Sequence, residues 1–339
     1  MESTDIVEPL LDPKNDRHTI FPLVYPDLWK KYKIHESLIW HSHEVKLKGD
    51  LEHWKRLNEN ERYFLKHILA FFASSDKIVA LNLAERFGCE VTIPEVKFFY
   101  DFQKMMENIH SEVYSRLIKT YISDFAEQKK LFNAVETIPC VMKKANWALK
   151  WIKSDESFQV RLIAFAAVEG ILFSGSFCAI YWMNERGMLP GLAKANDFIA
   201  RDEGLHTSYA CFLYNNYIVN KVSFETVKLV IGEAVEHEIE FITEALPCRL
   251  IGMNSDNMIK YIKFCANRLV NQLGYENMYN DREASQPFSF MDRICLREKS
   301  NFFEDEPSAY RKFDEDDDGT EAKSNDPFAN LGAIIQMYN

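Results

Sequence analysis

The chain has 339 residues, of which 47% are hydrophobic and 27% are charged, a composition typical of a globular protein. Its formal net charge of −11 argues against a surface that binds nucleic acid or an anionic membrane, because such a surface would repel their phosphate groups. The seven cysteines are widely spread and form no Cys-x-x-Cys pair, so we interpret them as reduced thiols of a cytoplasmic protein.

The N-terminal residues 1–20 begin with an acidic stretch and lack the basic and apolar regions of a signal peptide. We expect them to form a mobile segment on a protein that stays in the cytoplasm. Beyond them, prolines are far apart and apolar residues recur at spacings of three and four, the period of an α-helix. This pattern predicts an all-α domain over residues 21–296, with main helices at residues 58–86, 95–123, 126–152, 155–184, 190–218, 223–245 and 254–274.

One segment, Leu162–Trp182, spans 21 residues and is apolar enough to suggest a membrane span. It carries Glu169 near its middle, however, and an ionisable residue is unfavourable in lipid. No second segment of the same kind accompanies it. We therefore interpret it as a buried core helix of a protein that makes no membrane contact.

From Arg297 onward the composition becomes strongly acidic, with acidic runs at residues 304–306 and 314–318. Such a segment has too few apolar residues to build a core, and we expect residues 297–339 to form a flexible acidic tail. The last residues, from Phe328 on, are apolar again. This apolar tip is compatible with a tail that docks on a partner and also with a frayed chain end.

Two Glu-x-x-His sequences, Glu107 to His110 and Glu203 to His206, are the first candidates for a metal site. Each places a carboxylate and an imidazole one turn apart on one helix face, where both can bind the same metal ion. The spacing alone is weak evidence in a chain with 51 acidic residues and nine histidines. A third acid-x-x-His pair, at residues 50–53, lies in a highly charged segment that we interpret as solvated and without metal.

Two further acids strengthen the metal hypothesis because their surroundings are apolar. Glu169 lies in a helix that is apolar on every face, and Asp76 lies between Phe72 and Val79 on another helix. A buried carboxylate needs a cation, although either acid taken alone could also be a core residue paired with Arg or Lys. Two lone acids and two Glu-x-x-His turns on four helices together match the ligand set of ferritin-like bundles that hold two iron or manganese ions.

Tyr114 follows His110 by one further helical turn and faces the same side of its helix. Its predicted surroundings are the apolar residues Phe173, Phe177 and Ile199. A phenol beside metal ions can be oxidised, and an apolar wall would shield the product from water. Tyrosine is also a common packing residue, so its position alone leaves both interpretations open.

Four stretches resemble those of a known family: FFASSD at 71–76, MENIHSEVY at 106–114, AAVEGILFSGSF at 166–177 and RDEGLH at 201–206. Together they resemble the small, radical-generating subunit of class I ribonucleotide reductase in its eukaryotic and viral form. The resemblance runs from about Phe21 to Tyr310. It implies a ferritin-like bundle in which two iron ions, with manganese as an alternative, are bound by Asp76, Glu107, His110, Glu169, Glu203 and His206.

The resemblance also implies a function for the centre. Reaction with dioxygen would produce a stable radical on Tyr114, and Phe173, Phe177 and Ile199 match the apolar residues around it. The radical equivalent would pass to a large catalytic subunit that reduces ribonucleoside diphosphates to deoxyribonucleotides. The residues that match the relay are Trp40, Asp202, His110 and the tail residue Tyr310. A homodimer is implied as well.

Some of these residues have a second interpretation from the sequence alone. Asp202 precedes Glu203 directly, so it is also the expected partner that orients a metal-bound histidine. Trp40 would otherwise be a packing residue. Two stretches depart from the family pattern: residues 41–48 keep only Glu44 of a usual acidic pair, and the chain ends in residues 331–339 without the usual acidic stretch and final phenylalanine. A divergent large subunit or weakened docking would each explain this ending.

Two rival functions use the same scaffold. A di-iron oxidase or monooxygenase would need a substrate cavity where Phe173 and Phe177 are expected. A metal-storing or purely structural partner subunit would not need the complete ligand set together with Tyr114. The residues therefore favour an active radical-generating subunit.

Overall fold

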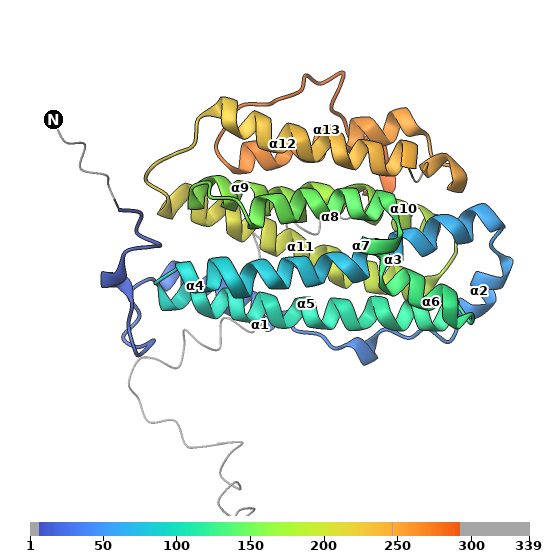
Figure 1. Ribbon diagram of the computed structural model, residues 1–339, viewed down its shortest axis with the longest axis horizontal. Helices are drawn as coiled ribbons and strands as arrows, with labels where there is room; N and C mark the ends of the chain where they lie inside the picture. The colour runs from blue at the N-terminus through green and yellow to red at the C-terminus, as the bar shows by residue number, and fades with distance from the viewer. Residues whose placement is uncertain (1–6, 246, 292–339) are drawn as a thin grey trace, which may run out of the picture. The chain divides into compact units, whose positions relative to one another are not determined.

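The computed structural model describes residues 7–245 and 247–291, and every regular element within these ranges is helical. The centre consists of two helix pairs that run side by side, α3 against α5 and α9 against α11 (Figure 1). Their bounds are α3 (Glu59–Asn82), α5 (Pro94–Tyr121), α9 (Phe158–Ala167) and α11 (Pro190–Tyr217). The prediction of an all-α fold is confirmed.

Other helices cover this centre on two sides. α1 (Pro26–Ser37) packs on α5. On the opposite side, α12 (Phe224–Ile239) and α13 (Ser255–Gln272) pack against each other and over α9 and α10 (Ser174–Glu185) (Figure 1). The central helices are therefore shielded from water, which is the environment that the apolar sequence around Asp76 and Glu169 requires.

The prediction of one continuous helix at residues 126–152 is wrong. The structure divides it into α6 (Phe125–Phe132), α7 (Ala134–Thr137) and α8 (Pro139–Ile152). Pro139 lacks a backbone N–H and its ring would clash with the preceding turn, so it begins a helix here and does not continue one. Two shorter helices, α1 and α2 (Asp50–Arg56), were not among the predicted main helices.

The interpretation of Asp50 and its charged neighbours as a solvated segment is also wrong for Asp50. Asp50 is fully buried, and its carboxylate accepts hydrogen bonds from the backbone N–H groups of Gly191 and Leu192, both at 2.8 Å, and from the Tyr121 hydroxyl at 2.6 Å. The free N–H groups of the first turn of α11 attract a carboxylate. Asp50 thus anchors α11, and its neighbour His53 accepts a hydrogen bond from the Leu189 N–H at 3.3 Å.

The predicted helix at residues 155–184 is interrupted at its middle by a π-helical segment, Val168–Leu172, between α9 and α10. This wider turn carries Glu169. A π-helical turn inserts one extra residue into a helix and leaves backbone groups without their usual partners. It therefore shifts the direction in which Glu169 points, at a cost that other residues must offset.

A buried ion pair supplies partners at this interruption. The Lys144 ammonium on α8 donates to the Leu172 carbonyl at 2.5 Å and to the Glu238 carboxylate on α12 at 2.6 Å. The other oxygen of Glu238 accepts from the Gly175 N–H at 2.9 Å. The Lys144 ammonium also lies over the Phe71 ring, 3.6 Å from its centroid. The pair joins α8 and α12 to the backbone on the C-terminal side of Glu169.

Among the described residues, one helical stretch, Phe158–Glu185, is long and apolar enough to cross a membrane by length and composition. Its most apolar window is 94% buried inside the protein. The burial explains the apolar composition of this stretch, in line with its interpretation as a core helix.

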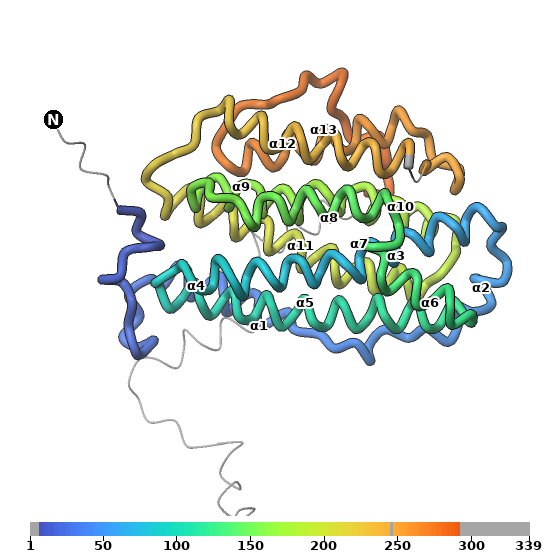
Figure 2. The backbone as a smooth tube through the Cα atoms, viewed as in Figure 1, coloured from blue at the N-terminus to red at the C-terminus, as the bar shows by residue number. Residues whose placement is uncertain are grey.

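Part of the N-terminal segment that was expected to be mobile is anchored to the bundle through Glu8 and Leu10. Leu10 is fully buried, and its carbonyl accepts from the Thr92 N–H at 2.8 Å. The Glu8 carboxylate accepts from the Val219 N–H at 2.7 Å. Figure 2 shows these residues in dark blue at one end of the bundle. The predicted acidic tail, residues 297–339 with Tyr310, lies outside the described residues.

We expect Lys144→Met to lower the stability by about 3–5 kcal/mol, because it leaves the Glu238 charge buried without its partner. Adding Glu238→Gln to the same chain should recover a large part of this loss, since the amide carries no charge and its oxygen still accepts from the Gly175 N–H. Urea denaturation followed by circular dichroism measures both effects. A double variant less stable than Lys144→Met would contradict this account.

Candidate metal centre

The six predicted ligands come from the four central helical stretches, and their exposed fractions lie between 0 and 3%. Asp76 is on α3, and Glu107 and His110 are on α5. Glu169 is on the π-helical segment between α9 and α10. On α11 lie Glu203 and His206. Because α3 pairs with α5 and α9 pairs with α11, the six side chains gather inside the bundle.

Four of these residues, Glu107, Glu169, Glu203 and His206, offer ligand atoms that all lie within 4.8 Å of one another. The Nδ1 atom of His206 lies 3.0 Å from carboxylate oxygens of Glu169 and Glu203, and 3.2 Å from Glu107. The Nδ1 atom of His110 lies 3.3 Å from Glu107 and from Glu203. Glu107 and Glu203 thus lie between the two histidines.

Asp76 belongs to the same cluster electrostatically. Burial raises its pKa well above the usual value, and the nearby charge of Glu107 raises it further. Burial and the charge of Glu203 act in the same way on the pKa of Glu169. Without a cation, negative charge on Asp76 and Glu169 is therefore unfavourable, and both groups keep their protons to a higher pH than usual.

Several polar atoms of the cluster have no hydrogen-bond partner. They are both carboxylate oxygens of Asp76, both of Glu107, Oε1 of Glu203 and Nδ1 of His110. Leaving such atoms buried and unpaired is unfavourable by several kcal/mol. Carboxylate oxygens and imidazole nitrogens are suitable ligands for iron and manganese ions, which would supply the missing positive charge. The donor set therefore fits a two-metal centre.

Three of the four predicted relay residues, Trp40, Asp202 and His110, are in contact with one another. The Asp202 carboxylate lies 3.0 Å from Nε2 of His110 and accepts from the Trp40 indole N–H at 2.7 Å. The Trp40 and His110 rings are nearly parallel, 5.8 Å between centroids. Arg201 donates to the second oxygen of Asp202 at 3.0 Å. Trp40 is only 2% exposed, so these contacts connect the cluster to a buried tryptophan.

Sequence reasoning missed two residues that contact the predicted ligands. Gln103 donates through its amide to Glu169 at 2.9 Å, and Nε2 of His35 lies 3.3 Å from Nε2 of His206. Gln103 sits on the same face of α5 as Glu107, which was a usable signal. His35 is a single histidine on the unpredicted helix α1, and nothing in the sequence near it indicates a contact with α11.

Tyr114 is buried against an aromatic cluster that contacts it through Phe72. Its ring stacks on Phe72 with 4.7 Å between centroids and 4° between planes, and Phe72 also contacts Phe173 and Phe177. Tyr114 is 1% exposed and its hydroxyl has no hydrogen-bond partner. Burial, followed by the charge of Asp76, raises the pKa of this phenol well above its usual value. The structure therefore contains a buried phenol near the acids, as the sequence predicted. Ile199, which lies on α11, is also buried.

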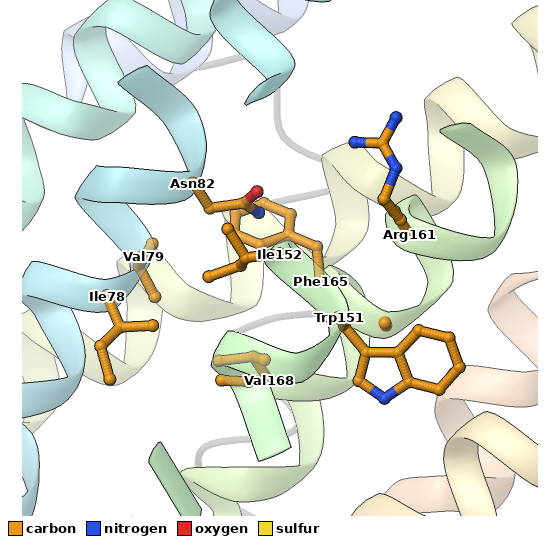
Figure 3. Close-up of a pocket in the computed structure, with 10 residues that line it drawn as sticks. Ile78, Val79, Asn82, Trp151, Ile152, Arg161, Phe165 and Val168 are labelled. Atoms are coloured by element: carbon orange, nitrogen blue, oxygen red, sulfur yellow. The ribbon is translucent and has the colours of Figure 1, made fainter. Parts of the chain in front are cut away.

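A small cavity lies between α3, α8 and α9. Figure 3 shows Val79 and Asn82 from α3, Trp151 from α8, and Arg161 and Phe165 from α9 around it. The lining is mostly apolar, and the Arg161 guanidinium is bound to the Glu90 carboxylate. This cavity presents no converging set of acids and histidines, so it is not the candidate metal centre.

The sequence matches the family described as "Ribonucleotide reductase, small chain" over residues 17–287. The ribonucleoside-diphosphate reductase small chain of Trypanosoma brucei brucei is 56% identical over 308 residues, covering 91% of this chain and 90% of that protein. The corresponding small chain of vaccinia virus (strain Ankara) is 51% identical over 306 residues, covering 90% of this chain and 95% of that protein.

A solved structure is similar as well. The ribonucleotide reductase Rnr4 homodimer from Saccharomyces cerevisiae matches with a TM-score of 0.76 and 35% sequence identity. The match covers 86% of this chain and 93% of that chain. The likeness supports the ferritin-like arrangement of the central helices.

We expect Asp76→Asn to stabilise the metal-free protein by about 1–3 kcal/mol at neutral pH, because it removes a buried charge without a partner. The folded state binds the Asp76 proton more tightly than the unfolded chain does. Metal-free wild-type protein should therefore lose stability as the pH rises from about 4, and Asp76→Asn should lose less. Thermal unfolding with and without Mn²⁺ measures these effects, and the variant should gain less from the ion.

Asp50→Asn is the matched control, since Asp50 is equally buried but its carboxylate accepts three hydrogen bonds. We expect it to lower the stability by about 1–2 kcal/mol and to leave the gain from Mn²⁺ unchanged. If both variants destabilise the metal-free protein equally, the acids of the cluster do not repel one another as argued.

Proposed function

The chain belongs to the family of ribonucleotide reductase small chains, and on this premise we propose that it holds two iron ions and generates a stable radical on Tyr114. It is a subunit of ribonucleoside-diphosphate reductase, an enzyme that also requires a large catalytic subunit. The radical equivalent formed here serves that large subunit in the reduction of ribonucleotides to deoxyribonucleotides.

The observation that carries the proposal is the group of acid oxygens without a hydrogen-bond partner near a buried phenol. The metal ligands are proposed to be Asp76, Glu107, His110, Glu169, Glu203 and His206. When bound, the ions supply the electrons that reduce dioxygen and the oxidising power that removes an electron from a neighbouring phenol. Manganese is an alternative, because the same oxygen and nitrogen donors bind both metals.

The chain's own residues have distinct tasks in this function. Phe72 stacks on the Tyr114 ring, and Phe173 and Phe177 pack against Phe72, so these buried aromatic rings are proposed to keep water and reductants away from the phenol. Asp202 fixes the His110 ring by accepting from its Nε2–H and accepts from the Trp40 indole at the same time. Trp40, Asp202 and His110 thereby form a continuous connection for the radical equivalent. Tyr310, outside the described residues, is proposed to continue it to the large subunit.

The assembly is proposed to be a cytoplasmic homodimer that binds the large subunit. The similar yeast structure is named as a homodimer, which supports the first part. The acidic tail with its apolar tip is the proposed docking element, although its ending differs from the family pattern.

Two alternatives are disfavoured by specific observations. An oxidase or monooxygenase would need space for an organic substrate beside the centre, but Phe173 and Phe177 are buried there, with 1% and 7% exposed. A purely structural partner subunit would not need to keep six buried ligands whose charges destabilise the metal-free fold. An active radical-generating subunit accounts for both features.

We expect metal-free protein supplied with ferrous iron and dioxygen to develop a tyrosyl radical signal in electron paramagnetic resonance. Tyr114→Phe should bind the same amount of iron and lack the signal, because only the phenol hydroxyl is removed. Tyr181→Phe is a control for another buried tyrosine and should keep the signal. Iron-loaded wild-type protein without any radical would refute the proposal.

We expect Trp40→Phe to keep the iron and the radical but to lose most of the reductase activity with the large subunit. The substitution removes the hydrogen bond from the indole N–H to Asp202, which connects Trp40 to the metal centre. Trp54→Phe is the control, since Trp54 is also buried but stacks on Tyr121. Full turnover in Trp40→Phe would show that the radical equivalent leaves by another route.

Deleting residues 327–339 should abolish reductase activity and spare the Tyr114 radical, because the deletion removes only the proposed docking tip. Turnover with the large subunit and the radical signal are measured on the same preparation. Unchanged turnover would mean that the apolar end of the chain does not dock.

A further inference from the structure

The two histidines of the metal centre have different partners at Nε2, the ring nitrogen that faces away from the proposed metal ligands. Nε2 of His110 meets the carboxylate of Asp202 at 3.0 Å. Nε2 of His206 meets another imidazole, Nε2 of His35, at 3.3 Å. Both members of the His35–His206 pair are 1% exposed, so no water competes for this contact.

The contact between two imidazole nitrogens holds only one proton. A hydrogen bond forms when one Nε2 carries a hydrogen and the other offers its lone pair. Nδ1 of His206 points to the oxygens of Glu169 and Glu203 at 3.0 Å, which is where a cation would be bound. With Nδ1 of His206 committed to a cation, its hydrogen lies on Nε2, and His35 must be the acceptor.

His35 is held in a fixed position for this task. Its ring lies between two aromatic rings of α5, with centroids 4.9 Å from Phe99 and 4.7 Å from Phe102. Its second nitrogen, Nδ1, is buried and has no hydrogen-bond partner. As an acceptor at Nε2, a neutral His35 carries its hydrogen on this Nδ1, so the ring presents a single lone pair toward His206.

We infer that His35 is a positioning residue that fixes the tautomer and the ring orientation of His206 in the metal centre. This inference rests on the proposed function, because it assigns the acceptor that one metal ligand uses. Metal-bound histidines usually donate to a carboxylate, a backbone carbonyl or water, and a neutral imidazole polarises the ring less than a carboxylate does. His206 is therefore a weaker electron donor to its metal than His110, and the two metal positions differ.

The test uses Co²⁺, which binds oxygen and nitrogen ligands and reports them by visible absorption, under exclusion of dioxygen. The full-length protein is titrated, and the protons of the ring N–H groups of metal-bound histidines are followed by paramagnetic proton NMR. Wild-type protein should bind two cobalt ions and show two exchangeable N–H signals. Wild-type protein that binds no cobalt would count against the proposed metal centre itself, and not only against the task of His35.

His35→Leu removes the acceptor and keeps an apolar side chain among the same aromatic rings. We expect one of the two cobalt ions to bind about 10–100-fold more weakly, and one of the two N–H signals to broaden or disappear. His35→Gln offers an amide oxygen as acceptor and should restore most of the affinity and the signal. If His35→Leu does not fold, His35→Met replaces it in the same comparison.

Phe102→Leu is the matched control, since it loosens the packing around His35 but keeps the acceptor nitrogen. It should weaken cobalt binding much less than His35→Leu does and keep both N–H signals. The inference is overturned if His35→Leu binds two cobalt ions with wild-type affinity and keeps both signals. It is also overturned if Phe102→Leu weakens cobalt binding as much as His35→Leu does, because packing would then explain the effect.

Discussion

An excess of acids over basic partners inside an apolar bundle is the constraint on which this structure depends. Four carboxylates approach two histidines where water is excluded, and several of their oxygens have no donor. Such a cluster is unfavourable in the metal-free chain, so the surrounding structure must hold it together by other means. The long central helices, the covering helices α12 and α13, and the anchoring of α11 by Asp50 all serve that end.

Much of the fold and of the candidate centre could be predicted from the sequence, and the reason is local. An acid such as Glu169 inside an apolar run is visible without knowledge of any distant residue, and a helical period shows itself within a few turns. The π-helical turn was not predictable in this way, because the Lys144 and Glu238 side chains that satisfy it come from other helices. His35 and Asp50 escaped for the same reason, since each acts on α11 from a distant part of the chain.

The partners of the two histidines show how a nearly symmetric ligand set is made unequal. Each Glu-x-x-His turn contributes the same two residue types, but Nε2 of His110 contacts Asp202 whereas Nε2 of His206 contacts His35. Asp202 is next to a ligand in the sequence and also binds Trp40, so the carboxylate side of the centre is the side connected to the tryptophan. On the imidazole side, the hydrogen bonds of the described residues run from His206 to His35 and do not reach a tryptophan.

The contact between Gly175 and Glu238 has a consequence for how the sequence can diverge. A Cβ atom at position 175 would lie 2.6 Å from Oε1 of Glu238, closer than two such atoms can approach. A side chain at Gly175 therefore requires the Glu238 carboxylate to move, and this movement would disturb its contact with Lys144. The effect of a substitution at any one of these three positions should therefore depend on which residues occupy the other two.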